Sequence, residues 1–261
     1  MDFDCKNMKM DQVHHNDAAA AAANAIQPEE ELNTELPDYL VRYYRWAYLW
    51  PAAVWLFDHQ PIINAILFGN YRKIMDQTMR MLRPEEAKKT LQVAAVYGQL
   101  TPKLARQIDD LHVIDVAPVQ LKSVASKLKD ADKNVQLKQM NAECLTYQTN
   151  SFDTALMFLL LHELPPEARV KSLREALRVL RPGGRFVIAE YGEIEKQHFL
   201  HRFAPMRWTL ITAEPFLDGF WKQNLNQLVE ECAELEGKQV EVEGQVDIFN
   251  GFYRVVSYRL Q

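Results

Sequence analysis

Residues 90–101, Thr-Leu-Gln-Val-Ala-Ala-Val-Tyr-Gly-Gln-Leu-Thr, have the order of a buried strand, a tight turn and the start of a helix. In loops of this kind glycines let the backbone approach a bound nucleotide, because a Cβ atom would lie in the way. Here only Gly98 is present, and Gln92 occupies the position near the strand end where an acid is expected. The loop therefore either no longer binds a nucleoside cofactor, or binds it differently for a different reaction.

Tyr97 is the most unusual side chain of this loop, and Ala94 and Val96 stand where further glycines are expected. Tyr97 could simply occupy the space that a glycine leaves in other proteins. Because it replaces a small residue at a turn that would face a ligand, we favour a functional role. Its phenol could donate a hydrogen bond or orient an amine.

Two polar residues follow the next strands of the same pattern. Asp115 lies 17 residues beyond Gly98, near the spacing of about 20 at which an acid accepts hydrogen bonds from ribose hydroxyls. Asn141, followed by Ala142, comes after the third predicted strand, where its amide oxygen could accept a hydrogen bond from an adenine amino group. Both residues could also have a purely structural role, since Asp115 could cap the next helix and Asn141 could be an ordinary loop residue. We expect Asp115 to bind ribose and Asn141 to bind adenine.

His162 and Glu163 follow the predicted strand 154–161, at the edge of the sheet where α/β enzymes hold their substrates. An imidazole and a carboxylate there could act as general base, general acid or metal ligands. His162 could instead only pack within its loop, and for Glu163 that structural role is favoured. Glu190, at the end of the predicted strand 185–190, is a further oxygen donor near this edge. The spacing identifies no metal site, so the metal ligands stay unassigned.

Downstream of residue 90, apolar strands alternate with helices. The run 154–161 is almost entirely apolar, as expected for a parallel strand buried on both faces. Two final strands, 240–249 and 252–259, flank Asn250-Gly251, a strong hairpin signal. This pattern predicts an α/β fold of the doubly wound, Rossmann-like class, with a mostly parallel sheet and a C-terminal antiparallel hairpin. The other strands are predicted at 91–96, 111–115, 135–140 and 185–190, and helices at 102–107, 118–128, 167–180 and 195–236.

Two segments precede this α/β domain, which we place at residues 85–261. Residues 1–36 are acidic, contain an alanine run and are predicted to be disordered. Residues 37–84 are rich in aromatic residues and are predicted to form an N-terminal helical cap. Its helices are expected at 38–50, 51–67 and 71–82.

The first cap helix is predicted to begin at Asp38 as N-cap and to place Tyr39, Tyr43, Trp46 and Trp50 on one face. Aromatic residues at helical spacing usually belong to a core. Their density and the neighbouring arginines fit an interfacial helix equally well, one that admits a lipid-soluble aromatic substrate and contacts anionic headgroups. The two interpretations do not exclude each other.

The charge distribution and the hydropathy argue against two broad classes of protein. The net charge is −5, but residues 1–37 contain eight acids and two lysines, which leaves +1 for the rest of the chain. A body so close to neutral has no nucleic-acid signature. No run approaches the roughly 18 uncharged apolar residues of a membrane-spanning helix, and neither a signal peptide nor an ordinary mitochondrial presequence is recognised. We therefore expect a soluble or peripheral protein.

Residues 37–261 resemble the rhodoquinone-biosynthesis proteins, which are related to the class I S-adenosylmethionine (SAM) methyltransferases and to the ubiquinone methyltransferases. The degenerate loop with Val96-Tyr97-Gly98 is the most specific part of this resemblance. The segment 151–184 is shared with many methyltransferases and discriminates little. The resemblance rests on Tyr-Tyr-Arg-Trp-Ala-Tyr at 43–48, Ile-Leu-Phe-Gly-Asn-Tyr at 66–71, Val-Ala-Ala-Val-Tyr-Gly-Gln-Leu-Thr at 93–101 and Glu-Pro-Phe-Leu at 214–217.

The resemblance implies the class I methyltransferase fold and the conversion of ubiquinone to rhodoquinone, in which a ring methoxy group is replaced by an amino group. In this family SAM is the amine donor and not a methyl donor, and a divalent metal, expected to be manganese, takes part. The expected location is peripheral, at the cytoplasmic face of a bacterial inner membrane or in the mitochondrial matrix of a eukaryote. The expected partners are ubiquinone, a membrane surface and other quinone-biosynthesis proteins, with no nucleic acid.

On this interpretation the candidate residues fall into three groups, for catalysis, cofactor binding and quinone binding. Gln92 would remove a carboxylate that helps keep the amine of SAM protonated, which favours a nucleophilic amine. The candidates are Tyr97 and His162 for catalysis; Gln92, Tyr97, Gly98, Asp115, Asn141 and Ala142 for the cofactor; and Trp46, Trp50, Arg207 and Trp208 for the quinone.

Two rival functions stay open from the sequence. The first is a conventional SAM-dependent methyltransferase that acts on a quinone precursor, for which an intact acidic, glycine-rich loop would be expected. The second is a non-catalytic methyltransferase-like subunit of a quinone-biosynthesis complex. The altered loop suits this second alternative, whereas Asp115 and Gly98 argue against complete loss of the cofactor site.

Overall fold

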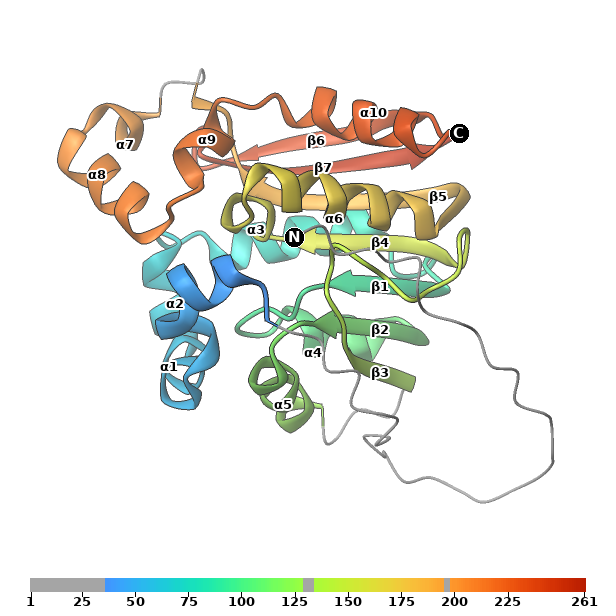
Figure 1. Ribbon diagram of the computed structural model, residues 1–261, viewed down its shortest axis with the longest axis horizontal. Coiled ribbons are helices and arrows are strands. Elements are labelled where there is room, and N and C mark those ends of the chain that lie inside the picture. Colours follow the sequence, from blue (N-terminus) through green and yellow to red (C-terminus); the bar gives the residue numbers. More distant parts are fainter. Residues whose placement is uncertain (1–35, 129–133, 195–197) are drawn as a thin grey trace. The chain divides into compact units, whose positions relative to one another are not determined.

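The computed structural model describes residues 36–128, 134–194 and 198–261 (Figure 1). The predicted disordered segment 1–36 therefore lies outside the described residues, apart from Leu36. The cap residues 37–84 and the α/β residues that follow them belong to one compact unit.

A seven-stranded sheet forms the centre of this unit, with strand order β3-β2-β1-β4-β5-β7-β6. Strands β1 to β5 are parallel, β7 runs antiparallel to β5, and β6 pairs antiparallel with β7. The predicted fold class is confirmed, and so is the terminal hairpin, whose turn holds Asn250 and Gly251 at positive φ. The strands are β1 Lys89–Val93, β2 Asp110–Asp115, β3 Asn134–Gln139, β4 Phe152–Phe158, β5 Leu180–Tyr191, β6 Val240–Ile248 and β7 Tyr253–Leu260.

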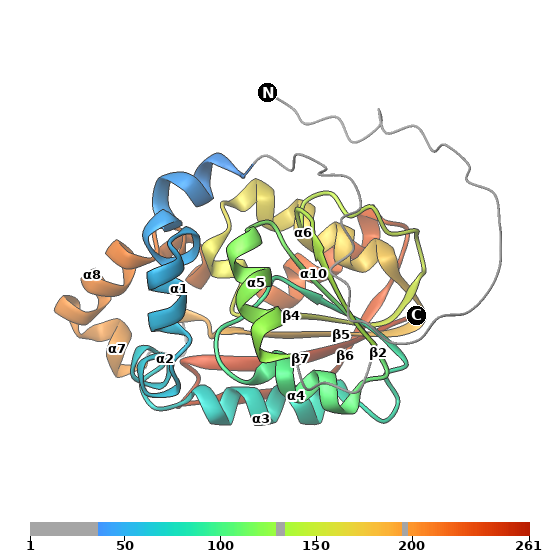
Figure 2. The same cartoon turned by 90° about the horizontal axis from the view of Figure 1, so that it is seen from below.

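Helices cover both faces of the sheet: α3 and α4 lie on one face, and α6 and α10 on the other (Figure 2). Every residue of β4 is buried, because an inner parallel strand packs against helices on both sides. The carboxyl ends of the parallel strands meet at one edge, which is the expected place for a ligand. The helices of this domain are α3 Tyr71–Leu82, α4 Leu100–Gln107, α5 Pro118–Lys127, α6 Pro166–Val179 and α10 Leu225–Leu235.

The first cap helix differs from its prediction, because Leu40–Leu49 forms a π-helix. A π-helix bonds each residue to the fifth one along, so its side chains do not follow the spacing of an α-helix. The buried side chains are Leu40, Tyr44 and Ala47, whereas Trp46 and Trp50 are 47% and 54% exposed. The aromatic face predicted from α-helical spacing is therefore wrong.

The capping prediction for this helix is wrong as well. Tyr39 occupies the N-cap position, with no side-chain hydrogen bond to the helix, so Asp38 does not cap it.

The predicted second helix, 51–67, is in fact two short helices, α1 Pro51–Phe57 and α2 Gln60–Ile66. Pro61 lies in the first turn of α2, where the missing N–H would have no helical partner and is tolerated. Inside one continuous helix over 51–67, the same proline would remove a hydrogen bond and break the helix. Asp58, between the two helices, accepts hydrogen bonds from the Gly98 amide and the Lys127 ammonium, both at 2.7 Å. The break thus attaches the cap to the loop after β1.

The predicted helical region 195–236 contains four helices among its described residues. Proline and polar caps separate them, since Pro205 opens α8 and Asn224 caps α10. Within the part of the chain that the structure describes, no helix is long and apolar enough to cross a membrane. The three helices before α10 are α7 Phe199–Arg202, α8 Ala204–Ala213 and α9 Leu217–Trp221.

Candidate functional site

A cavity of about 380 Å³ lies at the carboxyl ends of β1, β2 and β4, underneath the π-helix. Its walls are mostly apolar and aromatic, and a few polar side chains converge on it. This is the composition expected of a small-molecule site at a topological switch point. The lining comes from residues 94–97, 114–117, 140–142, 158–160, 162–164 and 213–214, together with the π-helix, α2 and single residues of neighbouring elements.

Asp115 lines the cavity and is held by two backbone amides. Its Oδ2 accepts from Ala95 N at 2.9 Å, and its Oδ1 accepts from Ala117 N at 2.7 Å. The N-cap of α5 is Ala117, so Asp115 lies two residues before the capping position of that helix. Burial raises the pKa of Asp115 to about 6, although both amide bonds favour the carboxylate. The remaining lone pairs can accept hydrogen bonds from a ligand.

Asn141 and Ala142 line the same cavity. The Asn141 Oδ1 accepts from the backbone amide of Glu143 at 2.9 Å, which orients the side chain. One lone pair of that oxygen and the amide NH₂ group are left for a ligand.

Gln92 does not line the cavity. It is fully buried, its Nε2 donates to the Ala94 carbonyl at 3.0 Å, and its Oε1 accepts from the Thr101 hydroxyl at 3.1 Å. Ala94 has φ of 68°, the left-handed conformation that favours glycine. The chain therefore keeps the backbone turn of a glycine-rich loop and uses Gln92 to connect β1 to α4.

We expect Gln92→Glu to lower the free energy of unfolding by about 2 kcal/mol, because a carboxylate cannot donate to Ala94 and would be buried. Urea unfolding followed by circular dichroism measures this. Gln107→Glu, at an exposed position on α4, is the matched control and should change stability little. Equal stability of the two variants would contradict the bonding described here.

Gly98 also lies outside the cavity and has a packing role. Its φ is 82°, and a Cβ at this position would collide with the Tyr71 hydroxyl. That hydroxyl accepts from the amide of Gln99 at 2.7 Å, and the Lys127 ammonium donates to the Gly98 carbonyl at 3.1 Å. The glycine that survives in the loop thus allows contact between the loop and α3.

Tyr97 lines the cavity and joins the loop to the cap. Its hydroxyl donates to the Ala47 carbonyl at 2.7 Å and accepts from Gln120 Nε2 at 3.0 Å. Its ring is stacked on that of Tyr48, with centroids 5.7 Å apart. Burial raises the pKa of Tyr97 well above its usual range. The hydroxyl hydrogen is already engaged with the π-helix, so the ring is what Tyr97 offers to a ligand.

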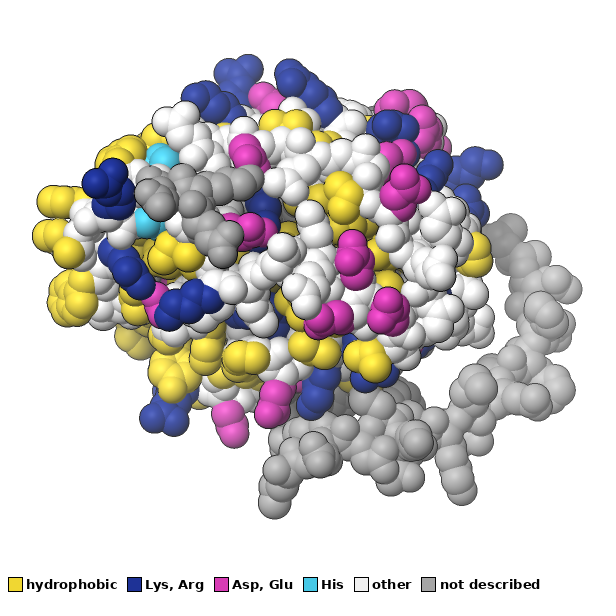
Figure 3. All heavy atoms as spheres, turned by 90° about the horizontal axis from the view of Figure 1, so that it is seen from above, with side chains coloured by type: hydrophobic (Ala, Val, Ile, Leu, Met, Phe, Trp, Pro, Cys, Tyr) yellow, Lys and Arg dark blue, Asp and Glu magenta, His cyan; other side chains and the backbone are white. Residues whose placement is uncertain are grey.

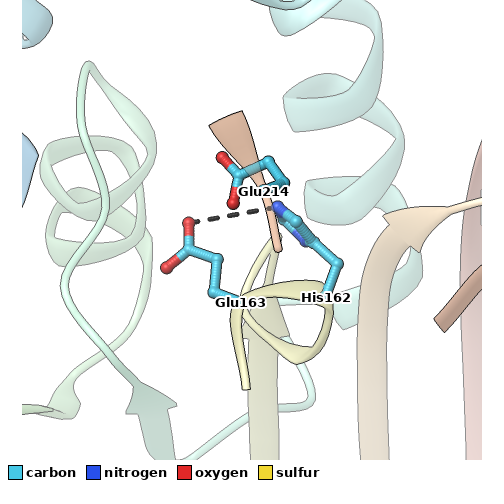
Figure 4. Close-up of side chains that lie close together, drawn as sticks. All are labelled: His162, Glu163 and Glu214. Carbon is cyan, nitrogen blue, oxygen red and sulfur yellow. Dashed lines mark ion pairs between the residues drawn. The ribbon is translucent and has the colours of Figure 1, made fainter. Parts of the chain in front are cut away.

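His162, Glu163 and Glu214 form the acid cluster, in which one ligand atom of each lies within 4.8 Å of the others (Figure 4). His162 Nε2 is 4.0 Å from Glu163 Oε1. Glu190 contacts the cluster through the other nitrogen of the His162 ring. Its Oε1 is hydrogen-bonded to His162 Nδ1 at 2.7 Å, and its Oε2 accepts from the Leu161 amide at 2.9 Å. A carboxylate on one imidazole nitrogen directs the other nitrogen toward a ligand, as in protein metal sites.

The acid cluster carries more negative charge than its buried position favours. Burial alone would lower the pKa of His162, but Glu190, Glu214 and Glu163 together raise it to about 9. Burial and then the charge of Glu214 raise the pKa of Glu163 to about 8, and burial also raises the pKa of Glu214. Such groups hold protons tightly, and a divalent cation can take the place of those protons.

Two tyrosines of the π-helix face the two carboxylates of the acid cluster. The Tyr48 hydroxyl donates a short hydrogen bond to Glu163 Oε1. The Tyr44 hydroxyl interacts with the Glu214 carboxylate. Both this hydroxyl and Glu214 Oε2 are buried, and neither has a hydrogen bond of ordinary geometry to a described residue. A buried carboxylate oxygen without an ordinary hydrogen bond, next to an imidazole and a second carboxylate, fits a donor set for a hard divalent ion.

Sequence reasoning missed Glu214, Tyr44 and Tyr48 as site residues. All three lie within the segments 43–48 and 214–217 that carry the resemblance, which was the available signal. The spacing of Tyr44 and Tyr48 fits one helix face, but nothing in it relates them to the glutamates, since the fold brings together residues more than a hundred positions apart.

Of the four predicted quinone-binding residues, the structure places one at the cavity and three away from it. Trp46 lines the cavity, whereas Trp50, Arg207 and Trp208 do not. Arg207 forms an ion pair with Asp218 at 2.7 Å, and Trp208 is 70% exposed. The far wall of the cavity is instead made by Ala213 and Glu214, which follow α8.

Comparisons with known proteins agree with this geometry. Residues 90–184 match the family model described as Methyltransferase domain. UbiE of Rickettsia akari (strain Hartford), a ubiquinone/menaquinone biosynthesis C-methyltransferase, is 29% identical over 151 residues, 54% of this chain and 60% of the relative. UbiE of Shewanella halifaxensis (strain HAW-EB4) is 30% identical over 167 residues, 59% of this chain and 65% of the relative. The chain thus spans less than two thirds of the length of these relatives.

A solved structure of the same fold contains S-adenosyl-L-homocysteine. The N-methyltransferase NodS of Bradyrhizobium japonicum WM9, in complex with S-adenosyl-L-homocysteine, matches with a TM-score of 0.55 and 16% identity. The match covers 85% of this chain and 98% of NodS. At this identity the likeness shows the fold alone.

Proposed function

We propose that this chain transfers an amino group to a quinone, as a SAM-dependent enzyme related to the class I methyltransferases and distantly to the UbiE quinone C-methyltransferases. SAM would be the amine donor, and ubiquinone would be converted to rhodoquinone by replacement of one ring methoxy group. The observation that carries this proposal is the acid cluster of His162, Glu163 and Glu214, which lies in the same cavity as Asp115.

The altered loop supports a change in the way SAM is used. Asp115 would bind the ribose hydroxyls, and Asn141 with Ala142 would bind adenine. With Gln92 in place of an acid, no carboxylate at the end of β1 favours the ammonium form of the SAM amine. A neutral amine is the form that can act as a nucleophile.

The donor set fits a divalent metal such as manganese, which takes oxygen and imidazole ligands. His162 through Nε2, Glu163 and Glu214 would hold the ion, with Glu190 fixing the imidazole and Tyr48 fixing Glu163. When bound, such an ion supplies Lewis-acid polarisation of a carbonyl oxygen. Transfer of a methyl group from a sulfonium needs no such centre, so the acid cluster favours amine transfer.

The ring carbon that bears a methoxy group on a quinone is the terminus of a vinylogous ester. The neutral amine adds to this carbon, a carbon–nitrogen bond forms, and the carbon–oxygen bond to methoxide breaks. The proton that the nitrogen loses leaves with methoxide as methanol. The nitrogen is then bonded to both the quinone ring and Cα of SAM, so release of the amino group requires the Cα–nitrogen bond to break. Loss of the Cα proton would pass two electrons into the quinone ring and leave an imine of the quinol, and water would hydrolyse this imine to the aminoquinol, which is the reduced form of the aminoquinone, and the 2-oxo acid of SAM. The apolar walls of the cavity would hold the quinone ring, and Tyr97 and Tyr48 offer it stacked aromatic surfaces.

A conventional C-methyltransferase acting on a quinone precursor is the second candidate, and the UbiE relatives favour it. Incubation of the purified protein with ubiquinone, SAM and manganese separates the two candidates. We expect mass spectrometry to find an aminoquinone that disappears when the metal is chelated. A methylated quinone, or a product formed equally well with chelator, would contradict amine transfer at the acid cluster.

We expect Tyr48→Phe to weaken manganese binding by about tenfold, because the Glu163 oxygen loses the hydrogen bond that orients it. Isothermal titration calorimetry with manganese alone measures this. Tyr43→Phe, on the same helix, is the control, since its ring packs on Phe216 and not on the acid cluster. Equal affinities of the two variants would show that Tyr48 does not position Glu163.

A further inference from the structure

Two helical segments expose an unusual amount of aromatic surface at the end of the unit that carries the cavity. On the cap these residues are Trp50, Trp55, Leu56 and Ile66, and on α7 and α8 they are Phe199, Phe203 and Trp208. Trp55 is 66% exposed and Trp208 is 70% exposed. Soluble monomers rarely leave several large aromatic side chains uncovered in one region, so this surface has a partner. We call it the aromatic surface.

Both views of the ribbon place α1, α2, α7 and α8 at the same end, beyond the carboxyl ends of the parallel strands (Figures 1 and 2). Figure 3 shows hydrophobic side chains gathered at the end that carries α7 and α8, with Lys or Arg side chains beside them. The two segments are about 140 positions apart in the sequence, so only the fold brings them together.

Charge is almost absent from the aromatic surface and basic around it. Between Arg45 and Arg72 the only charged residue is Asp58, and its carboxylate is paired with Lys127. Between Arg202 and Glu214 the only charged residue is Arg207. This pattern, an uncharged aromatic area with arginines at its border, matches the apolar interior and anionic headgroups of a membrane.

The acids near this surface do not oppose that charge. Asp218 is paired with Arg207 and Lys222, and Glu214 is buried in the acid cluster. Arg42, Arg45 and Arg202 are exposed. Among the described residues of these segments, Asp38 is the exposed acid, so one exposed negative charge accompanies the three exposed positive charges.

The cavity opens on this surface. Trp46 and Ile66 both line the cavity and are 47% and 48% exposed, and Ala213 is a third lining residue at the surface. A ligand that leaves a bilayer at this point enters the cavity without crossing water. This gives a lipid-soluble substrate a direct route into the cavity. That role of the surface rests on the proposed function, but binding of the surface to a bilayer does not.

We propose that the aromatic surface of α1, α2, α7 and α8 docks on a lipid bilayer that contains anionic headgroups, with the exposed tryptophans and phenylalanines inserted at the level of the headgroups. No helix crosses the bilayer in this arrangement among the described residues. Docking is reversible, because it uses side chains and not a membrane-spanning segment.

Sedimentation with large vesicles that contain no quinone tests docking apart from the reaction. We expect binding to vesicles of phosphatidylcholine with phosphatidylglycerol, weaker binding to phosphatidylcholine alone, and release by salt. The double variant Trp55→Ser/Phe203→Ser should bind about tenfold or more weakly, because it removes one exposed aromatic side chain from each segment. Leu235→Ser, at a 63% exposed leucine of α10, is the matched control and should bind like the parent chain.

Quenching of tryptophan fluorescence by brominated lipids gives a second readout, which should decrease in Trp55→Ser. The proposal is overturned if the parent chain does not sediment with anionic vesicles, or if the double variant and the control bind equally. It is also overturned if the parent chain forms a dimer in solution that the double variant abolishes, since the surface is then covered by a second copy. Failure of the quinone reaction with intact vesicle binding would overturn only the proposed function.

Discussion

Glu214→Gln should weaken manganese binding by about 100-fold or more and abolish aminoquinone formation. The substitution keeps the size of the side chain but removes one of the two carboxylates of the acid cluster. Loss of a residue that only orients a metal ligand lowers metal affinity by about 10- to 100-fold. Loss of a charged ligand itself should therefore lower the affinity by about 100-fold or more. Glutamine also relieves the charge repulsion with Glu163, so the variant should fold at least as well as the parent.

Glu167→Gln is the matched control, because Glu167 is an exposed acid four positions after Glu163. It should leave metal affinity unchanged. Calorimetry with manganese alone, followed by thermal unfolding of both variants, separates loss of a ligand from loss of the fold. Manganese binding by Glu214→Gln with the affinity of the parent chain would remove the acid cluster as the metal site.

The affinity for SAM should fall by about fivefold when the pH is lowered from about 6 to about 5, because the ionised fraction of Asp115 falls from about one half to about one tenth over that range. The carboxylate accepts hydrogen bonds from ribose hydroxyls, and burial has raised its pKa to about 6. Ligand binding therefore requires the ionised form, is fully available above this pKa, and is lost as the pH falls through it.

Asp115→Asn should bind SAM about 30-fold more weakly at neutral pH, since hydrogen bonds to a charged acceptor contribute about 1.5–3 kcal/mol. It should also lose the pH dependence between pH 6 and pH 5. Calorimetric titrations with SAM, without metal, measure both effects. Asp76→Asn, which removes the surface ion pairs with Arg72 and Lys103, should retain the dependence of the parent chain. A flat pH profile in the parent chain would contradict a ribose role for Asp115.

The α/β core could be predicted from the sequence because its signals are local. Apolar runs such as the one that became β4, and the Asn250-Gly251 turn, depend on neighbours in the chain. The strand ends that carry Asp115, Asn141 and His162 therefore fell in the cavity as expected. The boundaries shifted by a few residues, as β1 ends at Val93 because the chain turns at Ala94.

The cap and the acid cluster could not be predicted in the same way, because tertiary contacts determine them. The π-helix brings Tyr44 toward Glu214 and Tyr48 toward Glu163; their spacing of four fits one helix face, but it does not identify the distant carboxylates that they meet. Gln92 was expected to touch the cofactor, but its two hydrogen bonds direct it into the core. Trp208 was expected at the substrate and lies on the surface instead.

A non-catalytic subunit is the alternative that the site geometry disfavours. A chain without a reaction has no reason to keep one buried and two half-buried ionisable groups together at a cavity, since removing them from water is costly without a ligand. Binding of neither SAM nor manganese, even with quinone present, would support that alternative.

The most direct test of amine transfer uses SAM labelled separately at its amino nitrogen and at its methyl carbon. The purified protein is incubated with ubiquinone, manganese and each labelled SAM, and the quinone is analysed by mass spectrometry. We expect the nitrogen label in the quinone product and no methyl label. Methyl label in the quinone, or an aminoquinone whose nitrogen carries no label, would contradict SAM as the amine donor.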